Sequence, residues 1–332
     1  MVDLSLIIAT RNRARSLEAT LERLRRQAPS SACWEVIVVD NGSADDTPQV
    51  IERAGKDLPL VALYEPVPGK NRSLNRALEA ARGRLLVFTD DNADPGPGWL
   101  SEIHRASQER NGYNIFCGPI SPNYPEGTPD WLTSHRFSVI AFGSWSFDKP
   151  EGELRVTPCG ANYAIRASAL GRLRFRTDIG PQQKGAPLGG ETELLHRLFR
   201  RGERVVYVPT AVVGHDVYER QTRLGWLFDR AFRHGRGRGF LARETQRPHF
   251  LGAPSHLWGR IPMAMAGFLL SVVLLPFDRR SPLDRFEWGV RLFSDCGEFY
   301  QCLLMSLKRK FRLSVDDEIA PAALPVNLPD QI

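Results

Sequence analysis

The sequence lacks the cysteine pattern of a disulfide-bonded or zinc-binding protein. Its 332 residues include five cysteines, an odd number, and no two of them have Cys-x-x-Cys spacing. The chain also opens without the basic and apolar segments of a secretory signal peptide. These absences exclude a disulfide framework and a zinc ribbon, and we expect a reduced, cytoplasmic setting.

Signs of disorder and of nucleic-acid binding are absent as well. Apolar residues make up 42% of the chain and charged residues 25%, which is the composition of a globular protein. The net charge is +6, and residues 219–250 hold eight arginines against three acidic residues. This excess predicts an anionic partner, such as a phosphorylated substrate or a lipid surface. No RRM, KH or helix-turn-helix pattern is present, so we expect no nucleic-acid partner.

Short apolar runs alternate with amphipathic stretches in the first third of the chain. We predict strands and helices in alternation at residues 4–9, 16–27, 36–39, 47–54, 61–64, 73–81 and 85–88. This alternation predicts βαβ units and an α/β fold with a largely parallel sheet covered by helices. Ligands of such sheets bind at the carboxyl ends of the strands, where this chain places its polar clusters.

The remainder is less regular and ends in two apolar stretches. We predict strands at 111–120, 156–165 and 204–208, a helix at 189–200, and a loop or lid at 121–150. The uncharged run 261–277 would span about 25 Å as a helix, slightly less than the about 30 Å core of a bilayer. A helix at 286–311 has an apolar face and a basic end, which favours an anionic membrane surface. Soluble packing of these helices, or a true span, is the alternative.

Asp40 and Glu191 each lie at a position where a carboxylate can bind a ligand or act in catalysis. Asp40 ends a predicted strand before Asn-Gly-Ser, so it accepts hydrogen bonds either from a nucleoside or from its own turn. Glu191 follows two glycines at a helix start, where it serves either as a general base or only as a favourable charge on the helix dipole.

A third acidic cluster directly follows the predicted strand at 85–88. Its oxygen-bearing side chains are Asp90, Asp91, Asn92 and Asp94. Carboxylate oxygens are preferred by Mg²⁺ and Mn²⁺, which share their other positions with substrate phosphates. In an extended segment residues i and i+2 point the same way, so either Asp90 and Asn92 or Asn92 and Asp94 could act jointly. The alternative is a solvated acidic turn.

Seven segments carry a family resemblance. In chain order they read SLIIATRNR, VVDNGSADDT, GKNRSLNRAL, LLVFTDDNADPGPGWL, CGANYAIRASAL, GGETELLHRL and YVPTAVVGHDV. Together they resemble the family 2 glycosyltransferases of bacterial type, over about residues 3–218. The resemblance implies the GT-A fold, with a mixed, mostly parallel sheet and flanking helices. It also implies transfer of a sugar from a nucleotide-diphospho-sugar, expected to be UDP-linked, to a hydroxyl acceptor with inversion.

The resemblance also implies roles for individual residues. The donor nucleotide would be bound by Thr10, Arg11, Asp40, Lys70, Asn75, Asp90 and Asp91, of which the last two open a DXD motif. A Mg²⁺ or Mn²⁺ ion would be held by Asp91, Asn92, Asp94 and His215. Glu191 would be the general base, with Glu193 as the alternative, and Asn162 would lie on the acceptor side.

We expect the residues that contact the acceptor to lie mainly in the later part of the chain. We expect Trp131, in the predicted lid, and Arg223, Arg236 and Arg238 to contact the acceptor or its phosphate. In particular, we expect the glycines of HGRGRG to give a flexible backbone that lets the guanidinium groups converge on a phosphate.

These expectations divide the chain into three parts. We expect a catalytic domain over residues 1–238, a membrane-associated helical region over 239–320 and a disordered tail over 321–332. The acceptor would be a saccharide or a polyprenyl-linked saccharide in cell-envelope or exopolysaccharide assembly. The protein would work at the cytoplasmic face of the cell membrane, bound peripherally or monotopically.

The DXD motif departs from the family pattern at Asn92, where a third aspartate is usual. An amide oxygen holds a divalent cation less well than a carboxylate does. The alternative function is therefore a catalytically impaired sugar-nucleotide-binding protein of the same fold.

Overall fold

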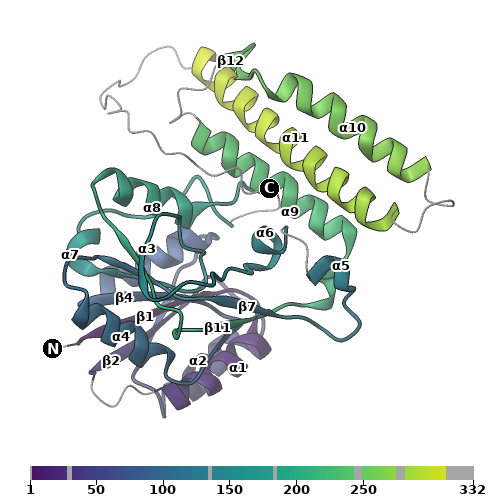
Figure 1. The fold of residues 1–332 in the computed structure, drawn as a ribbon. Helices are drawn as coiled ribbons and strands as arrows, with labels where there is room; N and C mark the ends of the chain where they lie inside the picture. The colour runs from purple at the N-terminus through teal and green to yellow at the C-terminus, as the bar shows by residue number, and fades with distance from the viewer. Residues whose placement is uncertain are drawn as a thin grey trace. The chain divides into compact units, whose positions relative to one another are not determined.

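The computed structural model describes residues 2–27, 32–133, 137–181, 185–242, 249–273 and 281–311 (Figure 1). The chain forms two compact units. The sheet unit comprises residues 1–124, 142–183 and 190–217, and the helical unit comprises residues 125–141, 184–189 and 218–332. The tail predicted over 321–332 lies outside the described residues.

An eight-stranded mixed sheet forms the centre of the sheet unit. In the order in which they pair, its strands are β3 (Leu60–Tyr64), β2 (Trp34–Asp40), β1 (Leu4–Thr10), β4 (Leu85–Asp90), β9 (Tyr163–Arg166), β6 (Ile115–Cys117), β10 (Val205–Tyr207) and β8 (Gly152–Leu154). Neighbours from β3 to β4 are parallel, as are β6 and β10, whereas β9 is antiparallel to both of its neighbours. The α/β fold with a mixed, mostly parallel sheet is confirmed.

Helices cover the sheet because their apolar residues recur at helical spacing. The helices of this unit are α1 (Ala14–Leu24), α2 (Thr47–Ala54), α3 (Lys70–Ala80), α4 (Trp99–Glu109), α7 (Ala167–Leu170) and α8 (Gly190–Arg200). Leu17, Leu21 and Leu24 of α1 share one buried core with α2, α4 and the alternate residues Leu6 and Ile8 of β1. The buried strands β1, β2 and β4 hold their carboxyl ends in fixed positions at one edge of the sheet.

A three-stranded sheet lies beside the end of β4. It has the order β5 (Ala93–Pro95), β11 (Val213–Asp216) and β7 (Ile120–Asn123). Register pairs His215 of β11 with Ala93 of β5, so His215 is brought next to the segment that follows Asp90. The predicted strand over 111–120 is two short strands, β6 and β7, and the predicted loop over 121–150 contains α5 (Asp130–Thr133) and α6 (Ser138–Phe142).

Three long helices form most of the helical unit. They are α9 (Leu224–Leu241), α10 (Leu257–Val273) and α11 (Ser281–Phe311). The expected boundary between residues 238 and 239 falls inside α9. The segment HGRGRG is not a flexible loop: it continues α9, and Gly235 and Gly239 let α9 approach α11 closely. No helix among the described residues is both long and apolar enough to cross a membrane.

We predict that Gly297→Ala destabilises the helical unit. A Cβ on Gly297 of α11 would lie 2.0 Å from the carbonyl oxygen of Phe232 in α9, so the two backbones would have to separate. The expected cost is about 1–3 kcal/mol of unfolding free energy, measured by denaturant unfolding. The matched control is Gly259→Ala in α10, where nothing lies within 4 Å of the added Cβ. Because alanine favours helices, the control is expected to stabilise by up to about 1 kcal/mol. Equal effects of the two changes would contradict close helix packing.

Candidate functional site

The carboxyl ends of three neighbouring strands deliver polar side chains to one edge of the sheet. Thr10 ends β1, Asp40 ends β2 and Asp90 ends β4. The register sets Thr10 beside Asp40 and Ala9 beside Asp90. Polar residues therefore meet where three buried apolar strands finish, as the sequence predicts.

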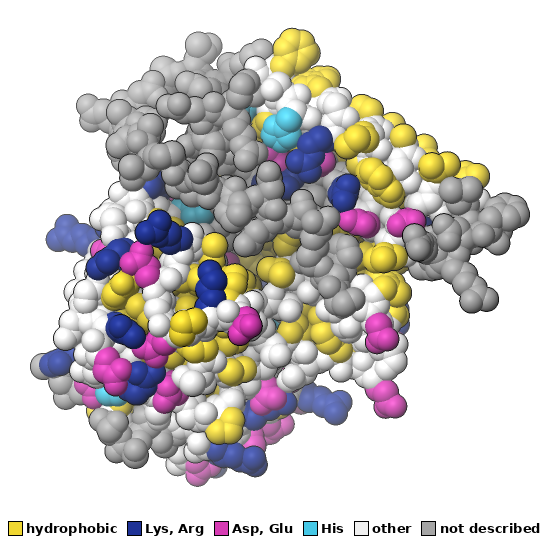
Figure 2. All heavy atoms as spheres, viewed as in Figure 1, with side chains coloured by type: hydrophobic (Ala, Val, Ile, Leu, Met, Phe, Trp, Pro, Cys, Tyr) yellow, Lys and Arg dark blue, Asp and Glu magenta, His cyan; other side chains and the backbone are white. Residues whose placement is uncertain are grey.

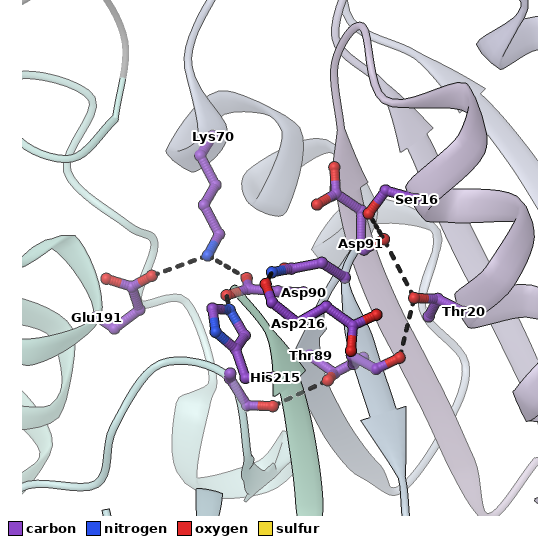
Figure 3. Close-up of polar contacts among 12 residues, drawn as sticks. Ser16, Thr20, Lys70, Thr89, Asp90, Asp91, Glu191, His215 and Asp216 are labelled. Atoms are coloured by element: carbon purple, nitrogen blue, oxygen red, sulfur yellow. Dashed lines mark hydrogen bonds and ion pairs between the residues drawn. The ribbon is translucent and has the colours of Figure 1, made fainter. Parts of the chain in front are cut away.

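Lys70 lies between two carboxylates from distant parts of the chain. Its Nζ donates to Asp90 Oδ1 at 2.6 Å and to Glu191 Oε1 at 3.1 Å (Figure 3). Lys70 begins α3, whereas Glu191 stands in the first turn of α8. The sequence separations from Lys70 are 20 residues to Asp90 and 121 to Glu191, so only the folded chain assembles this group.

The charges of this group control its protonation. Burial alone would lower the pKa of Lys70, but the negative charges of Asp90 and Glu191 raise it above its usual value. Burial alone would raise the pKa of Asp90, but the Lys70 ammonium and the neighbouring His215 hold it well below its usual range. Lys70 is therefore charged and Asp90 ionised at neutral pH.

Asp91 points away from Lys70 toward the first strand and helix. Its Oδ2 accepts a hydrogen bond from Thr10 Oγ1 at 2.8 Å, and its Oδ1 lies 3.5 Å from Arg13 Nη1. The backbone carbonyl of Asp91 accepts from Ser16 Oγ at 2.8 Å and from Thr20 Oγ1 at 3.1 Å (Figure 3). Burial raises the pKa of Asp91 although Arg13 opposes the shift. These contacts fix the turn after β4, and with it Asp90.

His215 approaches Asp90 from β11. Its Nε2 lies 3.6 Å from Asp90 Oδ2, and its Nδ1 is buried without a hydrogen-bond partner in the described structure. An imidazole nitrogen and a carboxylate oxygen suit Mn²⁺ or Mg²⁺ when phosphate or water completes the coordination. In the described ranges, no group of three His, Cys, Asp or Glu side chains is placed to hold a metal ion. Asp90 and His215 thus fit a cation whose coordination a substrate completes, whereas the carboxylate of the predicted ligand Asp91 bonds Thr10 and lies beside Arg13.

Asn92 and Asp94 do not join this group. The i, i+2 alternation assumed an extended segment, but residues 91–92 form a turn. Asn92 Nδ2 donates to the Asp216 carbonyl at 2.7 Å, and the Asp94 carboxylate lies 3.1 Å from Arg23 Nε. The structure therefore assigns Asp94 to an ion pair with Arg23 in place of the predicted metal site.

Other residues predicted to bind the nucleotide have mixed positions. Asp40 is buried at the end of β2, and its Oδ1 accepts the Ser43 backbone N–H at 2.9 Å, as in the turn-forming alternative. Arg11 is exposed just after β1. The amide of Asn75 is bound to the Phe175 backbone, donating to its carbonyl at 2.9 Å and accepting from its N–H at 2.8 Å. Asn75 thus anchors the chain after α7.

One predicted acceptor residue, Asn162, is packed inside the sheet unit. The Asn162 amide, 1% exposed, accepts from Trp99 Nε1 and donates to the carbonyls of Pro119 and Ala211. This amide has no surface for an acceptor, so Asn162 supports the fold instead of the predicted acceptor contact.

The two candidate bases in α8 differ in how much of the side chain is exposed. Glu193 is 2% exposed and paired with Arg197 at 2.8 Å. Glu191, with 17% of its side chain exposed, faces Lys70. The geometry favours Glu191 over Glu193 as a group that a substrate can reach.

The predicted acceptor residues of the helical unit bind within that unit. Arg238 Nη2 lies 3.0 Å from Asp295 and 2.6 Å from Glu298, both buried in α11. Arg236 bonds the Gln301 side chain and the Gly185 carbonyl. These guanidinium groups neutralise or satisfy buried groups of the bundle, which the sequence pattern did not reveal.

The other two predicted acceptor residues are placed differently. Trp131 packs on Phe286, with ring centroids 5.0 Å apart. Arg223 is largely exposed near Glu219, at 3.5 Å.

Arg13 and Asn71 were not predicted individually. Arg13 stands in the segment SLIIATRNR, so its charge beside the acidic cluster was available as a signal. Asn71 is fully buried, and its Nδ2 donates to the carbonyls of Arg176 and Ile179 at 2.7 and 2.8 Å. A Cβ on Gly190 would lie 2.4 Å from Asn71 Nδ2, so the second glycine before Glu191 lets α8 begin against α3.

Comparison with known proteins agrees with this geometry. Residues 5–177 match the family described as Glycosyl transferase family 2. Glycosyltransferase AglE of Haloferax volcanii is 23% identical over 240 residues, which cover 68% of this chain and 75% of AglE. The glucosyl-dolichyl phosphate glucuronosyltransferase of the same organism is 22% identical over 205 residues, which cover 60% of this chain and 65% of that protein.

A solved structure shares the fold. The mannosyltransferase PcManGT from Pyrobaculum calidifontis, in complex with GDP-Man and Mn²⁺, superposes with a TM-score of 0.60. The match has 19% sequence identity and covers 90% of this chain and 89% of the other. The predicted GT-A fold is confirmed.

Proposed function

Because the chain belongs to glycosyl transferase family 2 and is a glycosyltransferase, we propose that it transfers a sugar from a UDP-linked donor to a hydroxyl acceptor with inversion. The observation that carries the proposal is the group of Lys70, Asp90 and Glu191 at the carboxyl edge of the sheet. In this group the Lys70 ammonium can face the donor diphosphate, and the Glu191 carboxylate can face an acceptor hydroxyl.

Glu191 is the general base of the proposed reaction. A sugar hydroxyl is a weak nucleophile, so a positioned carboxylate must take its proton as the new glycosidic bond forms. Lys70 holds the Glu191 carboxylate in position, because its Nζ lies 3.1 Å from Glu191 Oε1. The carbon–oxygen bond to the nucleoside diphosphate breaks, and the leaving group departs with the bonding electrons.

Lys70 stabilises that leaving group. A fixed ammonium near a developing phosphate charge lowers the barrier without reorganisation. Asp90 and His215 would hold a Mg²⁺ or Mn²⁺ ion, which when bound neutralises the diphosphate. Asn92 is not a metal ligand in this proposal, so its neutral amide is no longer a reason to expect a catalytically impaired protein.

The acceptor belongs to the proposal as well. One relative is named for a dolichyl phosphate substrate, which supports a polyprenyl-linked saccharide as acceptor. Such an acceptor would place the enzyme in cell-envelope or exopolysaccharide assembly. We propose that the sugar transfer takes place at the cytoplasmic face of the membrane.

A thermal-shift panel of nucleotide sugars, with and without Mn²⁺, tests the donor. A ligand at 100 times its dissociation constant stabilises the folded state by about 2.7 kcal/mol. We expect a UDP-sugar to raise the melting temperature more with Mn²⁺ than without it. The panel includes GDP-sugars because the structural neighbour holds GDP-Man. Absence of stabilisation by every nucleotide sugar would contradict the proposal, and binding without turnover over a broad acceptor panel would favour the impaired-protein alternative.

A further inference from the structure

Helix α10 exposes most of its large apolar side chains. The residues that it buries are Leu257, Ala264 and Ser271, spaced seven apart along one line. A Cβ on Gly267 would lie 2.3 Å from the Trp288 ring of α11, so this small residue also faces the bundle. A helix that packs on a protein core normally shows the opposite arrangement.

The outward side of α10 is continuous and apolar. Its exposed large side chains, between 41% and 68% exposed, are Trp258, Met263, Met265, Leu269, Leu270, Val272 and Val273. Figure 2 shows apolar side chains gathered along the outer edge that α10 forms. The helix contains one charged residue, Arg260, and its Nε lies 3.1 Å from the buried Asp295 of α11. The outward face thus has no charged side chain to keep it in water.

One end of this face carries exposed aromatic rings, and the neighbouring helix α11 ends there in a basic stretch of sequence. Phe250 and Trp258 contact each other at 5.6 Å between centroids, and they are 58% and 41% exposed. Exposed tryptophan with an apolar neighbour is typical of the interfacial layer of a membrane. The last turn of α11 carries the sequence Lys308-Arg309-Lys310, and α11 reaches this end because Gly252 lies against Ser306. Each basic residue near an anionic bilayer contributes about 1 kcal/mol of attraction.

We propose that the outward face of α10 (Trp258 to Val273) inserts into the surface of an anionic bilayer, with the helix axis in the membrane plane. Because the opposite side of α10 packs on α11 along its length, only the outward side can meet lipid. A second copy of the chain is the other possible occupant, but the face offers no polar or charged group to set a protein register. The basic end, by contrast, complements anionic lipid. The helix over 286–311, in which the sequence suggested a membrane face, buries Phe286 and Val290 and exposes Tyr300 and Leu307.

Vesicle flotation of the full chain tests this surface. We expect the wild type to float with vesicles of phosphatidylcholine and phosphatidylglycerol, and less with phosphatidylcholine alone. The double change Leu269→Gln/Leu270→Gln should lower the bound fraction at least about tenfold, because two apolar side chains lose their insertion energy. The matched control, Val67→Gln/Val212→Gln, removes two exposed apolar side chains from the sheet unit and should float like the wild type.

The possible results distinguish binding to lipid from binding to a second copy of the chain and from loss of the fold in a variant. All four side chains are exposed, so both double variants should keep the wild-type melting temperature. Quenching of tryptophan fluorescence by brominated lipid should fall in Trp258→Phe, which reports insertion directly. Equal flotation of the two double variants would overturn the proposal. The proposal would also be overturned if the wild type did not float and formed a dimer in solution, and if Leu269→Gln/Leu270→Gln converted that dimer to a monomer. None of these measurements uses sugar transfer, so the result stands apart from that of the proposed function.

Discussion

Replacing Glu191 by glutamine is expected to lower kcat by about 10²–10⁴-fold while the dissociation constant of the donor changes little. Glutamine keeps the size of the side chain, and its amide oxygen can still accept the hydrogen bond from Lys70. It cannot take the proton of the acceptor hydroxyl. Turnover measured with saturating donor, beside donor binding by calorimetry, checks both parts of the expectation.

Two other glutamates serve as controls for this result. Glu52→Gln, on the exposed side of α2, should leave turnover and stability unchanged. Glu193→Gln should lower the melting temperature, because it breaks a buried pair with Arg197. Wild-type turnover in Glu191→Gln, or a larger loss of turnover at unchanged stability in Glu193→Gln, would remove Glu191 from the role of base.

Replacing Lys70 by methionine is expected to lower kcat/KM by about 10²-fold or more. The variant loses the positive charge that faces both Asp90 and Glu191 and, in the proposed reaction, the leaving diphosphate. It should also lose about 1–3 kcal/mol of stability. This is less than for a fully buried pair, because Lys70 and Asp90 keep 21% and 24% of their side-chain surface exposed. Lys70→Arg should recover most of the stability, and Lys56→Met, on the exposed surface, should change neither quantity.

The pH dependence of the Lys70→Met effect follows from two opposite shifts. The folded pKa of Lys70 is raised, so its contribution is complete below the unfolded pKa of about 10.4 and is lost as pH rises through the folded value. The folded pKa of Asp90 is lowered, so its contribution is complete above about 3.9 and is lost as pH falls through the folded value. The stability difference between wild type and Lys70→Met should therefore be flat from about pH 5 to about pH 9. A difference that disappears near pH 7 would contradict the ion pair.

The central strands and their polar ends were predictable because the signal is local. Buried parallel strands read as short apolar runs, and each run here ends at a polar residue: Thr10, Asp40 and Asp90. The helix start that carries Glu191 was equally visible, since two glycines and two acidic residues open it. These features depend on neighbours in the sequence.

The contacts that assemble the site were not local and were predicted only in part. No spacing rule connects Lys70 with Glu191 across 121 residues. Asp94 was assigned to the metal by strand alternation, which fails because a turn intervenes after β4. The glycines of HGRGRG suggested a flexible loop, but tight contact with α11 offsets their low helix propensity. In each case tertiary packing outweighed the local pattern.

The same reasoning applies to the apolar faces of the two last helices. The helix at 286–311 has an amphipathic pattern, but the residues that it buries include Asp295, Glu298 and Gln301 as well as Phe286 and Val290. The run at 261–277 is apolar on all sides, so the sequence could not indicate which side packs. The buried residues Leu257, Ala264 and Ser271, together with Gly267 against Trp288, identify the inward side of α10.

A crystal structure of the chain with a UDP-sugar analogue and Mn²⁺ tests the site most directly. We predict a diphosphate oxygen within hydrogen-bond distance of Lys70 Nζ, anomalous scattering from Mn²⁺ beside Asp90 and His215, and the Glu191 carboxylate on the open face of the anomeric carbon. A donor bound away from the carboxyl ends of β1, β2 and β4, with the Lys70 contacts to Asp90 and Glu191 unchanged, would contradict the assignment of this group to sugar transfer.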